Sequence, residues 1–569
     1  MHCLIQTSLL ILALAGWGAL AFAEPEQQRA LRVQLVTTDF VLQGKLDRLA
    51  SWANESGVTL SSTRVSSAAF AKGLDETAAL LILDTPRPAD LSAVQQALGD
   101  RLSATTTPWI RVGGGAPASG NLPAAEARLL IEYYENGGEQ NLRNLFAYLR
   151  ARHDGAENES IARPTELAST GFYHPDAPGP FEVLDDYLAW GAERWAPQAP
   201  RIAFAIHRGA LVDGQLQLID ELIRRSEARG QAPLAFWVDD KDPQALSKVL
   251  VPARSEILVN LQHMQNGTAR QAEFLALGIP VLSTLTWREG DRAHWRASSS
   301  GVTPRTAATM LTVPESWGMT DPLVIAAIEN GEPTPIPEQL EALLGKVASL
   351  SRLRRLTPAE KHLAVMFWNH PDGAKNISAS NLNVPRSLAR LSLALHQTGY
   401  DVLPSDESEL IETAQRLLGG YYRPETLDTL LADGIALTLS LDQYQRWLAT
   451  LPEHDRHALN ERWGDPAAHW ALREIDGALH FVIPAARLGK LLLLPQPPRA
   501  GRPGEAYHDS KIPPDHLYLA AYQALRVGFK ADALIHFGTH GTQEWLPGKD
   551  KGLAAGDYPF LALGDLPVF

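Results

Sequence analysis

Two histidines and a glutamate near the end of the chain carry side chains that can bind a metal ion. His536, His540 and Glu544 follow one another at intervals of four residues in the segment ALIHFGTHGTQEWLPGKDKGL. Imidazole and carboxylate groups are common metal ligands, and both can accept a proton near neutral pH. The segment therefore suggests metal binding coupled to proton transfer. Because a spacing of four between histidines is common, a structural role for both is the competing interpretation.

The elements before these residues are predicted to place them at the edge of a sheet. A helix is predicted over 513–532, where apolar residues recur at helical spacing, and a buried strand over 533–537. In open α/β sheets, ligands bind just outside the carboxyl ends of the strands, which is where the loop begins. Gly538, Gly541 and Gly548 would let the backbone approach a large ligand closely.

A second candidate binding loop joins a predicted strand to a helix that begins near Pro385. Free backbone N–H groups at the helix N-terminus would favour a carboxylate or a phosphate. The alternative is a capped turn, with Asn383 as the N-cap residue and Pro385 in the first turn. The side chains in this loop that could bind a ligand are Lys375, Asn376, Asn381 and Arg386.

Several familiar catalytic motifs are missing from the sequence. It contains no G-x-x-x-x-G-K-[ST], H-E-x-x-H, G-x-S-x-G or C-x-x-C. ATP hydrolysis, zinc proteolysis and serine-hydrolase chemistry therefore lack their usual markers. His454 and His457 are expected on a solvated helical surface, because their neighbours in EHDRH are polar.

The overall composition is that of a globular protein with several domains. The chain has 569 residues, of which 45% are hydrophobic and 20% charged, with a formal net charge of -14. At about 150 residues per domain, this length allows three or four domains. The acidic balance argues against a nucleic-acid partner, which would favour a basic face.

Short apolar strands alternate with amphipathic helices along most of the chain, which predicts an α/β fold. We expect several Rossmann-like or flavodoxin-like α/β units, with a helical insertion at about 408–473. Polar, proline-rich segments mark the boundaries between them. The predicted domains are an N-terminal α/β domain at 24–175, a second at 180–335, and a third region at 336–569.

The first 23 residues are predicted to be a signal peptide. An apolar run from Ser8 ends in Ala21-Phe22-Ala23, an A-x-A cleavage pattern. The segment before the run is poor in positive charge, so an uncleaved anchor or a mis-assigned start are the alternatives. Cleavage would remove Cys3, the only cysteine, and export to the periplasm is expected; without use of the signal the protein would be cytoplasmic. No later segment is apolar enough to predict a membrane span.

The segment HFGTHGTQEWLPGK, at 536–549, resembles the signature of a family of chelatase large subunits. This family includes aerobic cobaltochelatase (CobN) and the large, ring-binding component of magnesium chelatase. The resemblance extends from about residue 200 onward, and because family members are longer, we expect this chain to match only their N-terminal portion. Further similar segments are PIPEQLEALLGKVASLSRLRR (335–355), NISASNLNVPRSLARLSLALHQTGYDV (376–402), PQPPR (495–499) and HDSKIPPDHLYLAAY (508–522).

The resemblance implies a cobaltochelatase-type ligase subunit that holds a tetrapyrrole while a divalent metal enters the ring. The metal would be cobalt, magnesium or iron, with cobalt insertion into a corrin, as in cobalamin biosynthesis, the simplest expectation. ATP would act only through separate AAA-type ATPase subunits. Two alternatives remain: an exported relative that removes metal from heme or a corrinoid, and an inactive tetrapyrrole carrier.

The resemblance also suggests a role for each candidate residue. His536 and His540 would deliver or contact the metal, and Glu544 would accept a proton. Trp545 would pack on the macrocycle, with Gly538 and Gly541 close to it. Lys549 and Arg386 would bind ring carboxylates, although a solvated basic side chain is the simpler interpretation of either one.

Overall fold

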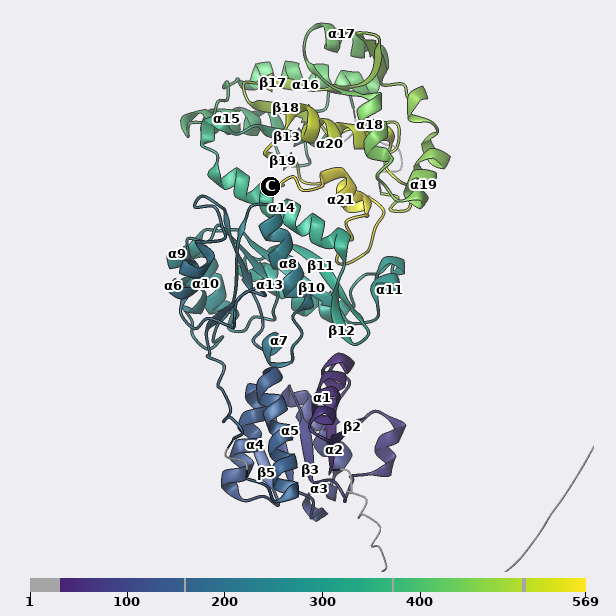
Figure 1. Ribbon diagram of the computed structural model, residues 1–569. Coiled ribbons are helices and arrows are strands. Elements are labelled where there is room, and N and C mark those ends of the chain that lie inside the picture. The colour runs from purple at the N-terminus through teal and green to yellow at the C-terminus, as the bar shows by residue number, and fades with distance from the viewer. Residues whose placement is uncertain (1–30, 158–159, 371–372, 504–507) are drawn as a thin grey trace, which may run out of the picture. The chain divides into compact units, whose positions relative to one another are not determined.

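The computed structural model describes residues 31–569 except 158–159, 371–372 and 504–507 (Figure 1). The predicted signal peptide, at 1–23, lies outside the described residues. The chain divides into two compact units, one made mainly of residues 31–165 and the other of residues 166–569.

The first unit is built on a five-stranded sheet with the order β2-β1-β3-β4-β5. Its central strands are buried because helices cover both faces: α1, α4 and α5 pack on one face and α2 on the other. Four strands are parallel, and β5 pairs antiparallel at the edge. The elements are β1 (Leu31–Thr37), α1 (Gln43–Glu55), β2 (Val58–Arg64), β3 (Leu80–Asp84), α2 (Pro88–Leu98), β4 (Trp109–Val112), β5 (Ala118–Gly120), α4 (Ala124–Asn136) and α5 (Gly138–Asp154).

The second unit begins with a seven-stranded sheet of order β12-β11-β10-β9-β7-β8-β6. Its five inner strands are parallel, and their order β8-β7-β9-β10-β11 is the flavodoxin-like order 2-1-3-4-5. Helices α8 and α14 cover one face, and α9 and α10 the other. The elements are β6 (Gly171–Tyr173), β7 (Arg201–Ala205), α8 (Gln217–Ala228), β8 (Ala232–Trp237), α9 (Ala245–Ala253), β9 (Ile257–Asn260), α10 (Gly267–Leu277), β10 (Val281–Trp287), β11 (Thr320–Glu329), β12 (Glu332–Pro335) and α14 (Pro337–Arg355).

A third sheet, of order β17-β18-β13-β19, completes the second unit. The central strand β13 pairs in parallel with β18 on one side and β19 on the other. Helices α15 and α16 cover one face, and α20 covers the other. The elements are β13 (Leu363–Phe367), α15 (Val384–Gln397), α16 (Glu407–Tyr422), β17 (Ala486–Leu488), β18 (Leu491–Pro495), α20 (His516–Gln523) and β19 (Ala533–Phe537).

A mostly helical insertion interrupts the third sheet between β13 and β17. After α16 it contains α17 (Leu427–Ala432), α18 (Leu441–Leu448) and α19 (Glu453–Trp463). One strand, β14 (Ala436–Ser440), lies among these helices. It forms an antiparallel sheet of order β14-β16-β15 with β15 (Leu472–Ile475) and β16 (Ala478–Pro484). The predicted α/β fold class with a helical insertion is confirmed.

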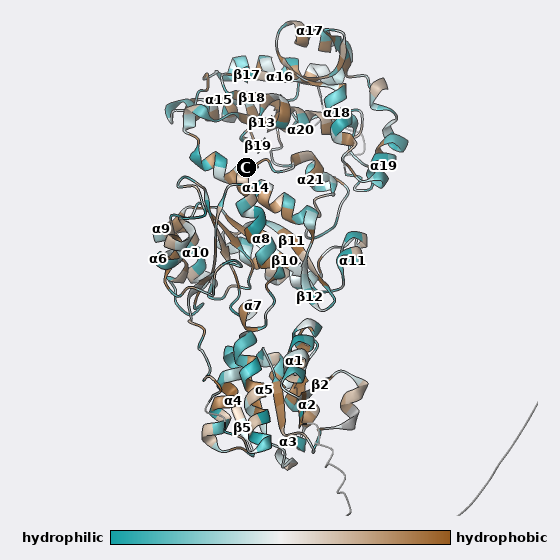
Figure 2. Cartoon of the chain, in the orientation of Figure 1, coloured by the Kyte–Doolittle hydropathy of each residue, from teal (hydrophilic) through white to brown (hydrophobic). Residues whose placement is uncertain are grey.

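The core of each sheet is apolar along its strands (Figure 2). All residues of β3, β8, β9, β13 and β18 are buried, as expected for parallel strands covered on both faces. None of the helices in the described ranges combines the length and the apolar character needed to cross a membrane.

Candidate functional site

The candidate residues gather where three parallel strands of the third sheet end. Met366 of β13 lies opposite His536 of β19, and Phe367 lies opposite both Phe537 and Pro495. The backbone N–H of Trp368 donates to the carbonyl of Phe537 at 2.9 Å. The loop that begins at Gly538 therefore starts at the carboxyl edge of the sheet, as the sequence predicts.

His536 is half-buried at this edge and is neutral at physiological pH. Its Nε2 atom lies 3.1 Å from the hydroxyl of Tyr522, which is buried in α20. Burial lowers the pKa of His536 to about 4, because an imidazolium ion would lose its hydration there. His536 therefore interacts with its surroundings as an uncharged imidazole.

A chain of hydrogen bonds determines which nitrogen of His536 carries the proton. The backbone N–H of Thr542 donates to Oε1 of Gln496 at 3.1 Å, which orients the amide so that Nε2 donates to the Tyr522 hydroxyl, also at 3.1 Å. The Tyr522 proton then points to Nε2 of His536, because the Tyr518 oxygen, at 3.5 Å, is too distant for a good O–H···O bond. His536 is thus assigned as the Nδ1–H tautomer.

The two tyrosines of this network remain protonated. Burial raises the pKa of Tyr518 to about 12 and that of Tyr522 well above its ordinary value. The hydroxyl of Thr542 donates to that of Tyr518 at 3.0 Å, which joins the glycine loop directly to helix α20. A neutral network of hydroxyl, amide and imidazole groups therefore lies behind the loop.

His540 and Glu544 lie on the exposed side of the same loop. Their side chains are 70% and 51% exposed, and Nδ1 of His540 is 3.5 Å from Oε1 of Glu544. The spacing of four residues therefore brings an imidazole and a carboxylate together in solvent, where a ligand could reach both. The ring of Trp545 packs against that of His508, with centroids 4.8 Å apart.

Two glycines of the loop have different surroundings. A Cβ atom on Gly538 would lie 2.7 Å from the Cβ of Trp368, closer than real side chains come. A Cβ atom on Gly541 would make ordinary contact with the amide of Gln496, at 3.5 Å. The close approach of Trp368 therefore accounts for a glycine at 538.

The second candidate loop contains the capped turn that the sequence offered as an alternative. Oδ1 of Asn383 accepts from the backbone N–H of Arg386 at 3.1 Å, with Pro385 in the first turn of α15. Nε of Arg386 pairs with Oε2 of Glu407 at 3.0 Å. The N-terminus of α15 is thus already capped by the chain itself.

The two candidate loops meet at the same edge of the sheet. The hydroxyl of Thr539 donates to that of Ser380 at 3.3 Å. The amide of Asn369, which follows β13, donates to two carbonyls of the second loop, those of Gly373 and Asn376, each at 3.0 Å. The four candidate side chains of this loop, Lys375, Asn376, Asn381 and Arg386, are all exposed.

Lys549 is buried away from the exposed pair. Its Nζ atom donates to the carbonyls of Ser298 at 2.6 Å and Arg296 at 3.2 Å, and lies 5.0 Å from the ring centroid of Trp295. Burial lowers its pKa. Lys549 thus joins the loop to the connection between β10 and β11, and its predicted contact with a ring carboxylate stays a prediction.

Four residues of the hydrogen-bond network are not among those predicted from the sequence. Gln496 is the one polar side chain in LLLLPQPP and directly follows a buried strand, as the glycine loop at 538 directly follows the strand of His536. This shared position after a strand could have identified Gln496 as a site residue. The tyrosines occupy one helix face at a spacing of four, but this pattern is equally typical of a core. The four residues are Gln496, Tyr518, Tyr522 and Thr542.

Potential metal ligands also gather in the second sheet. Single ligand atoms of His174, Asp176 and Glu227 lie within 4.8 Å of one another. Arg194 pairs with both carboxylates, at 2.6 Å from Asp176 and 3.5 Å from Glu227. Because Arg224 also lies 3.8 Å from Asp176, two arginines balance the two acids, and this cluster needs no metal to compensate its charge. His454 and His457 are each 79% exposed, which confirms the prediction of a solvated surface.

Known proteins resemble most of this chain. The sequence model of the CobN/Magnesium Chelatase family matches residues 131–569. The aerobic cobaltochelatase subunit CobN of Pseudomonas aeruginosa is 30% identical over 472 residues, which are 79% of this chain and 36% of that protein. A magnesium-chelatase subunit of Chlorobaculum parvum, the one designated H, is 26% identical over 465 residues, which are 78% of this chain and 35% of that protein.

A solved structure shares the fold. The catalytic subunit of cobaltochelatase from Mycobacterium tuberculosis matches with a TM-score of 0.71 and 26% identity, over 95% of this chain and 45% of that chain. This chain spans about a third of the length of the curated relatives it matches. Since the family model covers well over half of its residues, the chain belongs to the CobN/magnesium chelatase family.

Proposed function

We propose that this chain binds a tetrapyrrole and takes part in inserting a divalent metal into the ring, most simply cobalt into a corrin. Family membership supports this substrate class. The observation that carries the proposal is the arrangement at the carboxyl edge of the third sheet. There the exposed pair His540 and Glu544 lies on the loop that follows the neutral, half-buried His536.

Metal insertion requires the ring to lose its inner pyrrole protons while the metal loses water. The imidazole of His540 would guide the incoming ion, and the carboxylate of Glu544 would accept a proton and offset the ion's charge. His536 was also predicted to contact the metal. To ligate through Nε2, it would first have to give up its hydrogen bond to Tyr522.

The neighbouring side chains would orient the ring. Trp545 would stack on the macrocycle, and the exposed Lys375 and Arg386 would bind its carboxylates. Arg386 would have to exchange its exposed pairing with Glu407, which costs little because such pairs contribute about 1 kcal/mol or less. ATP would act through AAA-type ATPase partner subunits.

Absorption spectroscopy tests tetrapyrrole binding directly. We would titrate the purified chain with hydrogenobyrinate diamide, protoporphyrin and heme, and then repeat the titrations with His540→Ala and Glu544→Gln. His457→Ala is the matched control, because that histidine is equally exposed but lies on α19. We expect saturable binding of one ring, with metal exchange reduced in the two site variants and unchanged in the control. Unchanged binding and exchange in both site variants would overturn the assignment of these residues.

A second candidate function is removal of iron from heme by an exported form of the protein. The predicted signal peptide at 1–23 favours it, because the periplasm lacks ATP to drive insertion. Mass spectrometry of the protein from its native host would show whether residues 1–23 are absent. Loss of iron from heme without ATP would support removal, whereas ring binding without any metal exchange would support a carrier.

A further inference from the structure

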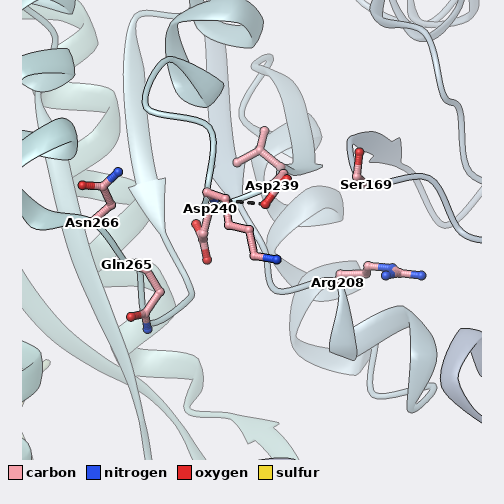
Figure 3. A pocket seen from close by; sticks show the side chains of 8 residues that line it. Ser169, Arg208, Asp239, Asp240, Gln265 and Asn266 are labelled. Atoms are coloured by element: carbon pink, nitrogen blue, oxygen red, sulfur yellow. Dashed lines mark hydrogen bonds between the residues drawn. The ribbon is translucent and has the colours of Figure 1, made fainter. Parts of the chain in front are cut away.

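A cavity of about 470 Å³ lies at the carboxyl ends of β7, β8 and β9, in the second sheet (Figure 3). None of the residues that line it belongs to the candidate site around His536 and His540. Its volume is within the range of sites that bind small molecules. The lining residues are Ser169, Arg208, Val238, Asp239, Asp240, Lys241, Gln265 and Asn266.

The strand order explains why a crevice forms here. Strand β7 lies between β8 and β9, and all three are parallel. Helix α8, which follows β7, covers one face of the sheet, and α10, which follows β9, covers the other. The loops after β7 and β9 therefore diverge, and in open α/β sheets such a reversal is where ligands bind.

Several groups that line the cavity favour an anion. Arg208 and Lys241 line it from the loops after β7 and β8. Helix α10 begins at Gly267, and its N-cap residue, Asn266, makes no side-chain capping bond. The N–H groups of the first turn of this 11-residue helix can therefore face a negatively charged group.

Asp240 supplies a hydrogen-bond acceptor between the two sides of the cavity. Figure 3 shows it between Gln265 and Asn266 on one side and Arg208 on the other. Its Oδ1 atom is buried without a hydrogen-bond partner among the described residues. Burial raises its pKa, against the attraction of the fully buried Arg270. A carboxyl group left in this state is stabilised by a donor, such as a ligand hydroxyl.

We propose that this cavity binds a sugar phosphate, either free or as the ribose phosphate of a nucleotide. The phosphate would lie at the N-terminus of α10, and Arg208 and Lys241 would supply positive charge from the loops after β7 and β8. A sugar hydroxyl would donate to Asp240, and the amides of Gln265 and Asn266 would bind further hydroxyls. In dinucleotide-binding folds a carboxylate contacts the ribose in the same way.

Calorimetric titration of the full chain tests this proposal with four probes: ribose 5-phosphate, AMP, ribose and inorganic phosphate. We expect saturable binding of the first two and weaker binding of the others. Lys241→Ala and Asp240→Asn should each weaken ribose 5-phosphate binding about tenfold, the value of one charge-assisted hydrogen bond. Lys248→Ala is the matched control, because this exposed lysine on α9 does not line the cavity.

The possible outcomes separate the parts of the proposal. Tighter binding of AMP than of ribose 5-phosphate identifies the nucleotide as the source of the sugar phosphate, and equal binding identifies the free sugar phosphate. Equal binding of inorganic phosphate overturns the sugar contact. No saturable binding, or variants that bind as the control does, overturns the site. If a variant fails to fold, hydrogen exchange of the wild-type amides in the first turn of α10 provides the test: ribose 5-phosphate must slow it.

Discussion

At the scale of single residues, His536 and His540 differ although they share one loop. His536 is half-buried and hydrogen-bonded to Tyr522, whereas His540 is exposed beside Glu544. The first is held in one tautomer by its neighbours, and the second is open to solvent and ligands. In the proposed function, His536 is therefore the fixed group and His540 the one that can react with a ligand.

The low pKa of His536 predicts a loss of stability in acid. The unfolded chain binds a proton at this residue below its ordinary pKa, about 6.5, but the folded chain does so only near 4. Stability from this group is therefore complete above pH 6.5 and falls as the pH drops toward 4. Between pH 7 and pH 5 we expect it to account for about 2 kcal/mol of the free energy of unfolding.

Urea unfolding at the two pH values measures this effect. Because the buried His174 and His516 also have lowered pKa values, the relevant quantity is the difference between wild type and His536→Asn. We expect the variant to lose about 2 kcal/mol less than wild type between pH 7 and pH 5. Equal losses in the two proteins would show that His536 titrates normally.

Tyr522→Phe should release His536 from its tautomer. The change removes the hydroxyl that donates to Nε2 and leaves the amide of Gln496 without its acceptor at 3.1 Å. We expect the free energy of unfolding to fall by about 1–3 kcal/mol. Nitrogen NMR of labelled histidine should show His536 changing from a single Nδ1–H form to a mixture.

Tyr444→Phe is the matched control for this experiment. Its hydroxyl is also buried and bonds the ring of another histidine, His516, at 2.8 Å. This control should lose stability but leave the His536 signals unchanged. Identical His536 spectra for wild type and Tyr522→Phe would contradict the assigned hydrogen-bond chain.

The sequence predicted the residues of the exposed pair but not the network behind them. The spacing of His540 and Glu544 lies within one short loop, so a local pattern was sufficient. His536 bonds Tyr522 of α20, which in turn bonds Gln496 after the end of β18, and no spacing along the chain relates Gln496 to Thr542. Such contacts exist only after the strands have paired.

At the scale of secondary-structure elements, the alternation of strands and helices predicted the α/β class. The order of the strands was not predictable, since β13 lies in the middle of its sheet between two strands that come more than a hundred residues later. The helix predicted over 513–532 was also only partly right. It continues from α20 into a π-helical turn at Ala524–Phe529, which apolar periodicity does not distinguish from α-helix.

Two glycine substitutions test how tightly the loop after β19 is packed. In Gly538→Ala the new methyl group would lie 2.7 Å from the Cβ atom of Trp368, so the backbone at one of the two positions must move. We expect a loss of about 1–3 kcal/mol in the free energy of unfolding, together with a change in tryptophan fluorescence.

Gly541→Ala should be nearly neutral, because its methyl group would meet Gln496 only at 3.5 Å. The comparison requires both variants to be measured by the same thermal or urea unfolding. Equal effects of the two substitutions would show that Trp368 does not confine the loop.

At the scale of the whole molecule, the chain consists of two units with separate cores. The first has its own sheet, β2-β1-β3-β4-β5, and helices on both faces. A fragment of residues 31–165 is long enough to bury a core of its own. We expect this fragment to unfold in one cooperative urea transition, followed by circular dichroism.

The full chain should then show more than one transition, because independent units need not unfold together. A fragment without secondary structure, or one that unfolds without cooperativity, would contradict the division into two units. The second sheet has a flavodoxin-like strand order, which is the basis for the proposed sugar phosphate site. That site does not depend on metal insertion.

The hydrogen bond from the Thr542 backbone to Gln496 couples the position of the glycine loop to the tautomer of His536, through Tyr522. If a bound ring drew the glycine loop away from the sheet, the amide of Gln496 would lose the contact that sets its orientation and could rotate. The Tyr522 hydroxyl would then accept a hydrogen bond from His536 instead of donating one, and the ring hydrogen of His536 would lie on Nε2 rather than Nδ1. Binding of the macrocycle would in this way change the tautomer of His536 at the edge of the sheet, without any change in charge.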